Sequence, residues 1–162
     1  MNKEKMKIFP SATGKNLNKK EVSIPENLEG ELNLLIVAFK QWQQADVNTW
    51  VPFLNSLKET HSNFQYYEVP TIRRMNWLYQ RMIDGGMRAG IPSIDTREYT
   101  ITLYIEKSPF KEALGIETEN EIHLFLVDRE GRIHSDWIGP YNSQFGEELT
   151  NKLASIKTAS MD

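Results

Sequence analysis

The chain has 162 residues and a net charge of −3, and its shares of hydrophobic (40%) and charged (25%) residues are those of an ordinary globular protein. It contains no cysteine, which excludes disulfides, thiolate metal sites, iron–sulfur clusters and a cysteine nucleophile. Its three histidines lie far apart, so we expect no metal and no cofactor. The mild acidity argues against general binding of nucleic acids or of membrane surfaces.

The length and composition predict one domain. We place it at residues 13–158, with tails at 1–12 and 159–162. No apolar segment is long enough for a signal peptide or a membrane span, which predicts a cytoplasmic or organelle-matrix protein.

The first third of the chain predicts two strands before the first helix. Residues 14–20 are turn-rich, and residues 21–24 form a short strand that Pro25 ends. The continuous apolar run at 32–39 (LNLLIVAF) is typical of a strand that is covered on both faces.

Two helices and another strand are expected next. Asp46 can cap a helix whose apolar residues recur at three-to-four spacing as far as Leu57, with a kink at Pro52. Residues 64–69 predict a strand, and residues 71–83 a helix with apolar residues on one side.

The remaining pattern predicts strands that end in a hairpin, followed by a last helix. In chain order we expect a strand at 99–105, a short helix between Ser108-Pro109 and Gly115, strands at 122–127 and 133–138 joined by a tight turn, and a helix from about Asn142. Strands that alternate with helices form a parallel core, and the hairpin adds antiparallel strands. We therefore expect an α/β fold of three layers, with a central mixed sheet of about five strands flanked by helices.

This order of elements, together with the opening segment 9–39 (FPSATGKNLNKKEVSIPENLEGELNLLIVAF), resembles the thioredoxin-like fold of redoxins and peroxiredoxins. Counted on from the first core strand, the two redoxin cysteines correspond to Gln44 and Val47, and the redoxin helix proline corresponds to Pro52. The cis-proline of the redoxin site corresponds to about Ile122. The resemblance thus implies a thioredoxin-like sandwich without its redox residues.

Most of the chain also resembles a narrower family, that of the mitochondrial ATP synthase assembly factor that acts on the F-zero sector, with its prokaryotic relatives. The segments that carry this resemblance are VAFKQWQQADVNTWVPFLNSL (37–57), QYYEVPTI (65–72), GGMRAGIPSIDTREYTITLY (85–104), LVDREGRI (126–133) and GPY (139–141). The run from Gly86 through Met87 and Arg88 to Pro92 is the most specific of them. The initiator methionine lies close to the domain, which favours a prokaryotic member. The resemblance implies contact with a membrane protein or its assembly intermediates.

Arginines gather in one window of the sequence. Five of the seven lie between positions 73 and 97, where no lysine occurs. Arg88 and Arg97 flank a Gly-Ile-Pro loop next to Met87. Planar guanidinium groups suit carboxylates, phosphates and aromatic rings, which favours a site for an anion or an acidic partner. The alternative is a solvated surface on which these arginines pair with acidic residues such as Glu68.

The former redox loop is the second candidate site. At the carboxyl end of the first core strand, Trp42 would be partly exposed, as interface anchors are, and Gln43 and Gln44 would offer donors and acceptors. We expect Asp46 to act mainly as a helix cap and Glu68 to pair with Arg88 or Arg97.

Two functions compete. The first is a redox-inactive thioredoxin-fold module without catalytic residues, which binds another protein as an assembly factor or chaperone and reaches the membrane only through that partner. The alternative is an enzyme or small-ligand binder with an arginine-lined pocket for an anionic molecule. Nucleic-acid binding is the weakest possibility, because the net charge is negative.

Overall fold

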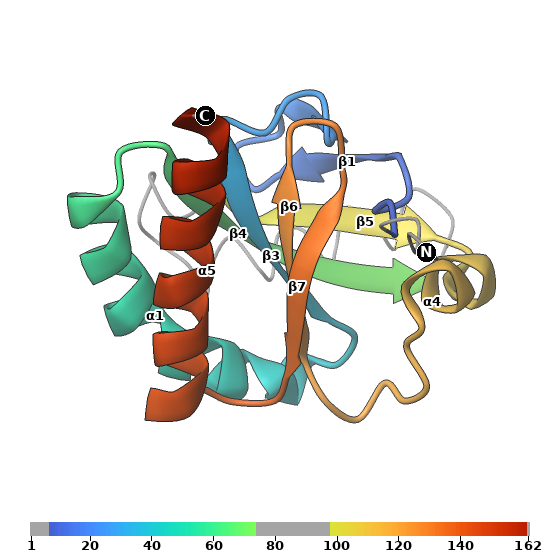
Figure 1. Cartoon of the computed structure of the whole chain (residues 1–162). Helices are drawn as coiled ribbons and strands as arrows, with labels where there is room; N and C mark the ends of the chain where they lie inside the picture. The colour runs from blue at the N-terminus through green and yellow to red at the C-terminus, as the bar shows by residue number, and fades with distance from the viewer. Residues whose placement is uncertain (1–6, 74–97, 162) are drawn as a thin grey trace, which may run out of the picture.

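The computed structural model describes residues 7–73 and 98–161 (Figure 1). These residues form one seven-stranded sheet in the order β2-β1-β5-β4-β3-β6-β7. The strands are β1 (Ala12–Asn16), β2 (Glu21–Ile24), β3 (Leu32–Ala38), β4 (Phe64–Arg73), β5 (Ile101–Ile105), β6 (His123–Asp128) and β7 (Ile133–Ile138). The helices are a 3-10 turn η1 (Gln41–Gln43), α1 (Gln44–Thr60), α4 (Lys107–Leu114) and α5 (Ser143–Met161).

Strand β3 lies in the interior of the sheet, between β4 and β6, as its apolar sequence predicts. It pairs in parallel with β4 and antiparallel with β6, and six of its seven residues are buried. Its one polar residue, Asn33, is satisfied locally, because its side-chain amide accepts from the Gly30 N–H and donates to the Gly30 carbonyl, both at 2.9 Å. A strand without unpaired polar groups can be covered on both faces.

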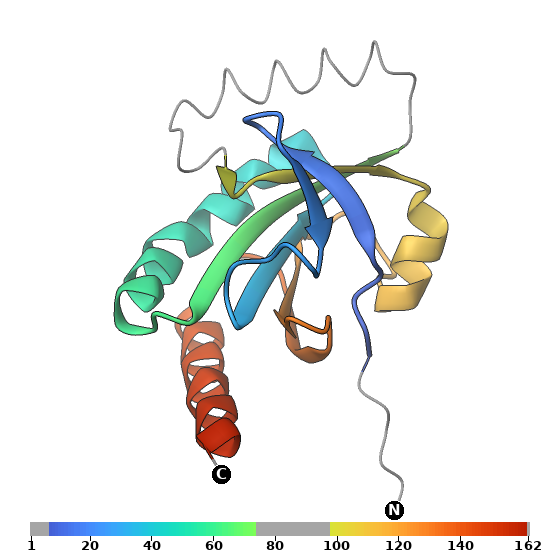
Figure 2. The same cartoon turned by 90° about the horizontal axis from the view of Figure 1, so that it is seen from above.

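Helices cover both faces of the sheet, which confirms the three-layer sandwich (Figure 2). Helices α1 and α5 pack on one face, around Trp50 and Leu149, and α4 packs on the other, around Phe110 and Phe125. No helix in the two described stretches is long and apolar enough to cross a membrane.

The sheet has seven strands rather than about five, and two parts of the expected pattern were wrong. Residues 12–16 form β1, although residues 14–20 were expected to be turn-rich; β1 pairs with both β2 and the distant β5. Strand β4 continues through Thr71 to Arg73, where a helix was expected, because these residues pair in parallel with β5. The rest of that expected helix, residues 74–83, lies outside the described residues.

Helix α1 begins earlier than expected. Its cap is Gln43, so Asp46 is the third residue of the helix and not the cap. In this first turn the Asp46 carboxylate still lies close to unpaired backbone N–H groups, where negative charge is favourable. The helix continues past Pro52 to Thr60.

Other local signals are confirmed. Gly115 ends α4 in the left-handed conformation, with a φ of 69°. At the start of α5 the Asn142 carboxamide accepts the Phe145 N–H at 2.8 Å, as a helix cap does. The division into one domain with two tails stays a prediction, although Phe9, inside the expected tail, is fully buried against Phe110 and Phe125.

Candidate functional site

The site is built where β3 ends. After Ala38 the chain makes the short turn η1 and then enters α1, so that Lys40 to Gln44 lie at the carboxyl end of β3. In open α/β sheets this end is where ligands and partners bind, because the loops there are not occupied in covering the core. The loop and strand that the sequence singled out are thus in the expected place.

Gln43 fixes this turn from inside. Its side chain is fully buried, and its Oε1 accepts the N–H groups of Phe39 at 2.8 Å and Lys40 at 3.1 Å. Its Nε2 donates to the backbone carbonyl of Glu119 at 2.6 Å, in the loop between α4 and β6. Both ends of the Gln43 amide are bonded within the protein, where they hold the turn, and the predicted role of Gln43 in binding stays a prediction.

Trp42 is presented to solvent by the turn that Gln43 holds. It is 59% exposed, the largest value among the exposed large hydrophobic residues of the described stretches, ahead of Ile8 and Ile138. A large aromatic side chain on a fixed backbone loses little conformational entropy on binding, which is typical of interface anchors. By contrast Trp50 is fully buried, and its indole N–H donates to the Gly139 carbonyl at 3.0 Å.

Gln44 and Glu68 form a second polar contact beside the turn. The Gln44 Nε2 donates to Glu68 Oε1 at 3.0 Å and to Asn48 Oδ1 at 2.9 Å. Glu68 is buried on β4, and this burial raises the pKa of its carboxyl group, while the bond from Gln44 lowers it. Burial and the nearby Glu68 also raise the pKa of Tyr66 to about 12.

The arginine part of the predicted site lies outside the described residues. This holds for Met87, Arg88 and Arg97, and therefore for the expected pairing of Glu68 with either arginine. That pairing stays a prediction.

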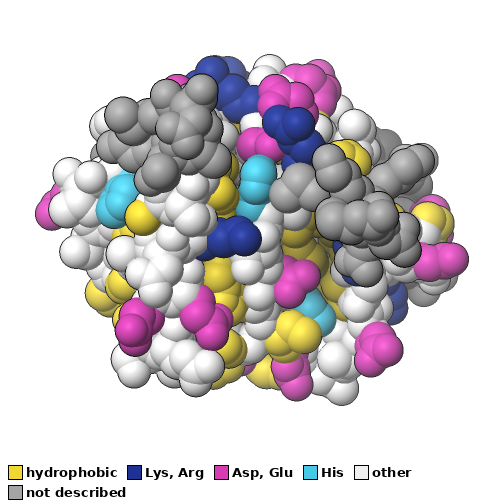
Figure 3. Space-filling model, viewed as in Figure 1, with side chains coloured by type: hydrophobic (Ala, Val, Ile, Leu, Met, Phe, Trp, Pro, Cys, Tyr) yellow, Lys and Arg dark blue, Asp and Glu magenta, His cyan; other side chains and the backbone are white. Residues whose placement is uncertain are grey.

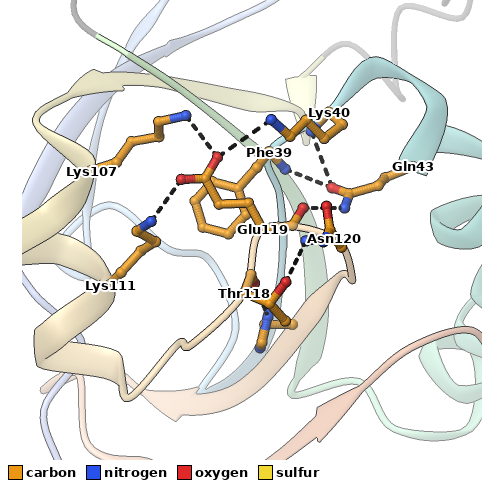
Figure 4. Close-up of polar contacts among 9 residues, drawn as sticks. Phe39, Lys40, Gln43, Lys107, Lys111, Thr118, Glu119 and Asn120 are labelled. Atoms are coloured by element: carbon orange, nitrogen blue, oxygen red, sulfur yellow. Dashed lines mark hydrogen bonds and ion pairs between the residues drawn. The ribbon is translucent and has the colours of Figure 1, made fainter.

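Three lysines meet one carboxylate next to the turn, an arrangement that we call the lysine cluster (Figure 4). Its members are Lys40, Lys107, Lys111 and Glu119. Lys107 and Lys111, on α4, donate to Glu119 Oε1 at 2.8 Å and to Oε2 at 2.7 Å, and the Lys40 Nζ lies 3.7 Å from Oε1. The hydrogen bonds from Lys107 and Lys111 lower the pKa of Glu119 to about 2.

Sequence reasoning missed the lysine cluster. The spacing of Lys107 and Lys111 places both on one face of α4, which was the only available signal. Nothing in the sequence indicated that Glu119 would fold back onto that face, or that Lys40 would join it from the end of β3.

The position that corresponds to the redoxin cis-proline is Ile122, which is buried directly before β6. In the described residues the cis peptide bond joins Ile24 and Pro25 instead. The next residue, His123, is packed and hydrogen-bonded: it is 4% exposed, and its Nε2–H donates to the Thr118 carbonyl at 3.0 Å. No group of residues suited to holding a metal ion occurs in the described stretches.

The layered sheet, with helix α1 entered from the end of β3, defines a thioredoxin-like fold. BsSco, a member of the Sco family of cytochrome c oxidase assembly proteins, superposes with a TM-score of 0.60 at 16% identity, over 95% of this chain and 96% of that chain. Copper-bound ScoI of Arabidopsis thaliana gives a TM-score of 0.60 at 12% identity, over 91% and 99% of the two chains. The thioredoxin domain of a thiol-disulfide oxidoreductase from Bacteroides vulgatus gives 0.55 at 19% identity, over 94% and 99%. At such identities these similarities show the fold alone.

Within that fold class the family is also defined. Residues 1–153 match the ATP10 protein family, and the chain belongs to it. This is the ATP synthase assembly factor family that the sequence segments resemble. No curated protein matches the chain in sequence.

Proposed function

We propose that this protein is a redox-inactive thioredoxin-fold assembly factor that binds another protein through the end of β3, with Trp42 as the anchor. Membership of the ATP10 protein family supports an assembly role and suggests components of an ATP synthase as partners. The lack of cysteine supports redox inactivity, because dithiol exchange needs a thiolate nucleophile. On this proposal the protein reaches the membrane through its partner.

The observation that carries the proposal is the contrast between Trp42 and the residue that follows it. Gln43 is fully buried with its amide hydrogen-bonded, whereas Trp42 is 59% exposed. Exposing a tryptophan forgoes about 2–3 kcal/mol of burial, so a rigid turn that presents one favours a binding role.

Purification of the tagged protein from its native organism tests the anchor. We expect subunits of the ATP synthase to copurify with the unaltered protein and to be lost from the Trp42→Ala variant. Ile138→Ala is the matched control, because Ile138 is also a large exposed apolar residue but lies on β7. Equal recovery of these subunits with Trp42→Ala would contradict the proposal, as would reduction of insulin disulfides by the purified protein at rates typical of redoxins.

The enzyme alternative, with an arginine-lined pocket, stays a prediction. That hypothesis needs Arg88 and Arg97 to converge with a titratable base such as Glu68, and both arginines lie outside the described residues. Nucleic-acid binding gains no support from the face shown in Figure 3, where the described lysines and arginines are separated by acidic and uncharged side chains.

A further inference from the structure

The lysine cluster holds more positive charge than it needs to neutralise its carboxylate. Three ammonium groups surround the single carboxylate of Glu119. Each carboxylate oxygen already accepts a short bond, from Lys107 at Oε1 and from Lys111 at Oε2. Lys40 makes the longest of the three contacts, and its side chain is 44% exposed, about twice the exposure of the other two. A second anion could therefore approach Lys40 without displacing Glu119.

This charge is joined to the Trp42 turn by one buried side chain. The Gln43 amide accepts the backbone N–H of Lys40 on one side and donates to the backbone of Glu119 on the other (Figure 4). Lys40 and Trp42 are two residues apart and both are exposed. The ammonium group of Lys40 and the indole of Trp42 are thus carried by the same fixed turn.

The surrounding charges limit what kind of anion fits. Helix α4 and the two segments that flank it also carry exposed acidic residues, which are Glu106, Glu112, Glu117 and Glu121. A broad anionic surface, such as a nucleic acid or a layer of acidic lipid headgroups, would meet these carboxylates as well as the lysines. A single compact carboxylate would interact with the surplus positive charge alone.

We propose that the lysine cluster binds one carboxylate of the partner protein while an apolar group next to that carboxylate packs on Trp42. The partner's recognition element is then the carboxylate of an acidic residue or of a C-terminus, next to an apolar side chain. This inference rests on the proposed function, since it describes the chemistry of the partner at the same turn. The attraction is electrostatic and partly exposed to solvent, so it contributes mainly selectivity.

N-acetyl-phenylalanine and its uncharged amide are a matched pair of probes for this site. In an NMR titration of the full chain, we expect the acid to shift the backbone amide signals of residues 40–43 and 118–120 saturably. We expect binding of the amide to be at least about tenfold weaker, because it lacks the charge that the lysines recognise. Lys40→Gln should weaken binding of the acid by about fivefold or more, and Lys152→Gln, a change on the distant helix α5, should leave it unchanged. Lys40→Gln leaves both short bonds to Glu119 in place, so signals outside the cluster should keep their positions.

Three results would overturn the inference: no saturable shifts, equal binding of acid and amide, or unchanged binding by Lys40→Gln. Recovery of the partner with the Trp42 and Lys40 variants distinguishes failure of this inference from failure of the proposed function. If recovery of the partner depends on Trp42 but not on Lys40, the proposed function stands and the carboxylate site is wrong. If the acid binds selectively at the cluster but Trp42→Ala still recovers the partner, the carboxylate site stands and the Trp42 anchor is wrong.

Discussion

Both ends of the Gln43 side-chain amide are hydrogen-bonded inside the protein. Replacing Gln43 therefore tests whether these bonds hold the turn that exposes Trp42. In Gln43→Ala the N–H groups of Phe39 and Lys40 and the carbonyl of Glu119 lose their partner. We expect the free energy of unfolding to fall by about 2–4 kcal/mol, because buried polar groups left unpaired cost about 1–3 kcal/mol each and water can reach part of the turn. Urea unfolding measures it.

Gln41→Ala is the matched control for that change. Gln41 lies in the same turn, but its side chain is exposed, and its carboxamide makes no hydrogen bond to another described residue. Its replacement should change the free energy of unfolding by less than about 0.5 kcal/mol. Equal effects of the two substitutions would show that Gln43 does not position the turn.

The lowered pKa of Glu119 predicts a dependence of stability on pH. The folded pKa is about 2, below the ordinary value of 4.5, so the carboxylate stabilises the fold above pH 4.5 and this contribution is lost as the pH falls toward 2. At neutral pH we expect Glu119→Gln to be less stable by about 1–2 kcal/mol, because two charged hydrogen bonds are lost in a partly exposed site.

The stability gap between Glu119→Gln and the unaltered protein should therefore close between pH 4.5 and pH 2. Urea unfolding across this range measures the gap, with Glu117→Gln, an exposed change in the same loop, as the control. A gap that stays constant across the range would mean that Glu119 is not held by the two lysines.

At the level of single residues, the sequence predicted only part of the candidate site. Trp42 was identified because it follows the apolar run of β3, and its exposure follows from the turn. The lysine cluster could not be found, because Lys40 and Glu119 are far apart in the chain and meet only when α4 packs against the end of β3.

At the scale of the elements, β1 shows why a strand can be missed. Its sequence, ATGKN, is polar and contains a glycine, which normally indicates a turn. The glycine is needed because β1 approaches β5 closely. A Cβ atom on Gly14 would lie 3.0 Å from a Leu103 methyl group and 3.1 Å from one of Ile101, and closer still to the Thr102 carbonyl. Residues 12–16 thus form a strand because they pair with the distant β5, and the local sequence preference gave no sign of this pairing.

Gly14→Ala tests this close approach. We expect the free energy of unfolding to fall by about 1–3 kcal/mol, because the methyl group must push β1 away from β5. Thr13→Ala, an exposed change on the same strand, should cost less than about 0.5 kcal/mol. Thermal or urea unfolding gives both values, and a neutral Gly14→Ala would contradict the register of β1 with β5.

At the end of strand β4, pairing with a distant strand again overrides the local sequence pattern. The apolar spacing after Pro70 favoured a helix, yet Thr71 and Ile72 pair with Leu103 and Tyr104 of β5. In contrast, β2, β3, β6 and β7 were predicted almost to the residue, since each is a short apolar or alternating run bounded by glycine, proline or aspartate.

For the whole molecule, the order of elements sufficed to predict a three-layer α/β sandwich, because strands that alternate with helices have few ways to pack, whereas the thioredoxin-like assignment also needed the resemblance of segment 9–39 to redoxins. Function does not follow from that fold, which carries many unrelated activities. What distinguishes this chain is the combination of its family, its lack of cysteine and an exposed tryptophan two residues before Gln44, the position that corresponds to the first redoxin cysteine.

Photocrosslinking in the native organism tests the central claim, that the protein binds its partner through Trp42, most directly. A photoreactive phenylalanine derivative is placed at position 42, and in a matched experiment at the exposed position 138. We expect a crosslink from position 42 to a subunit of the ATP synthase and none from position 138. The absence of such a crosslink from position 42, or its equal formation from both positions, would contradict it.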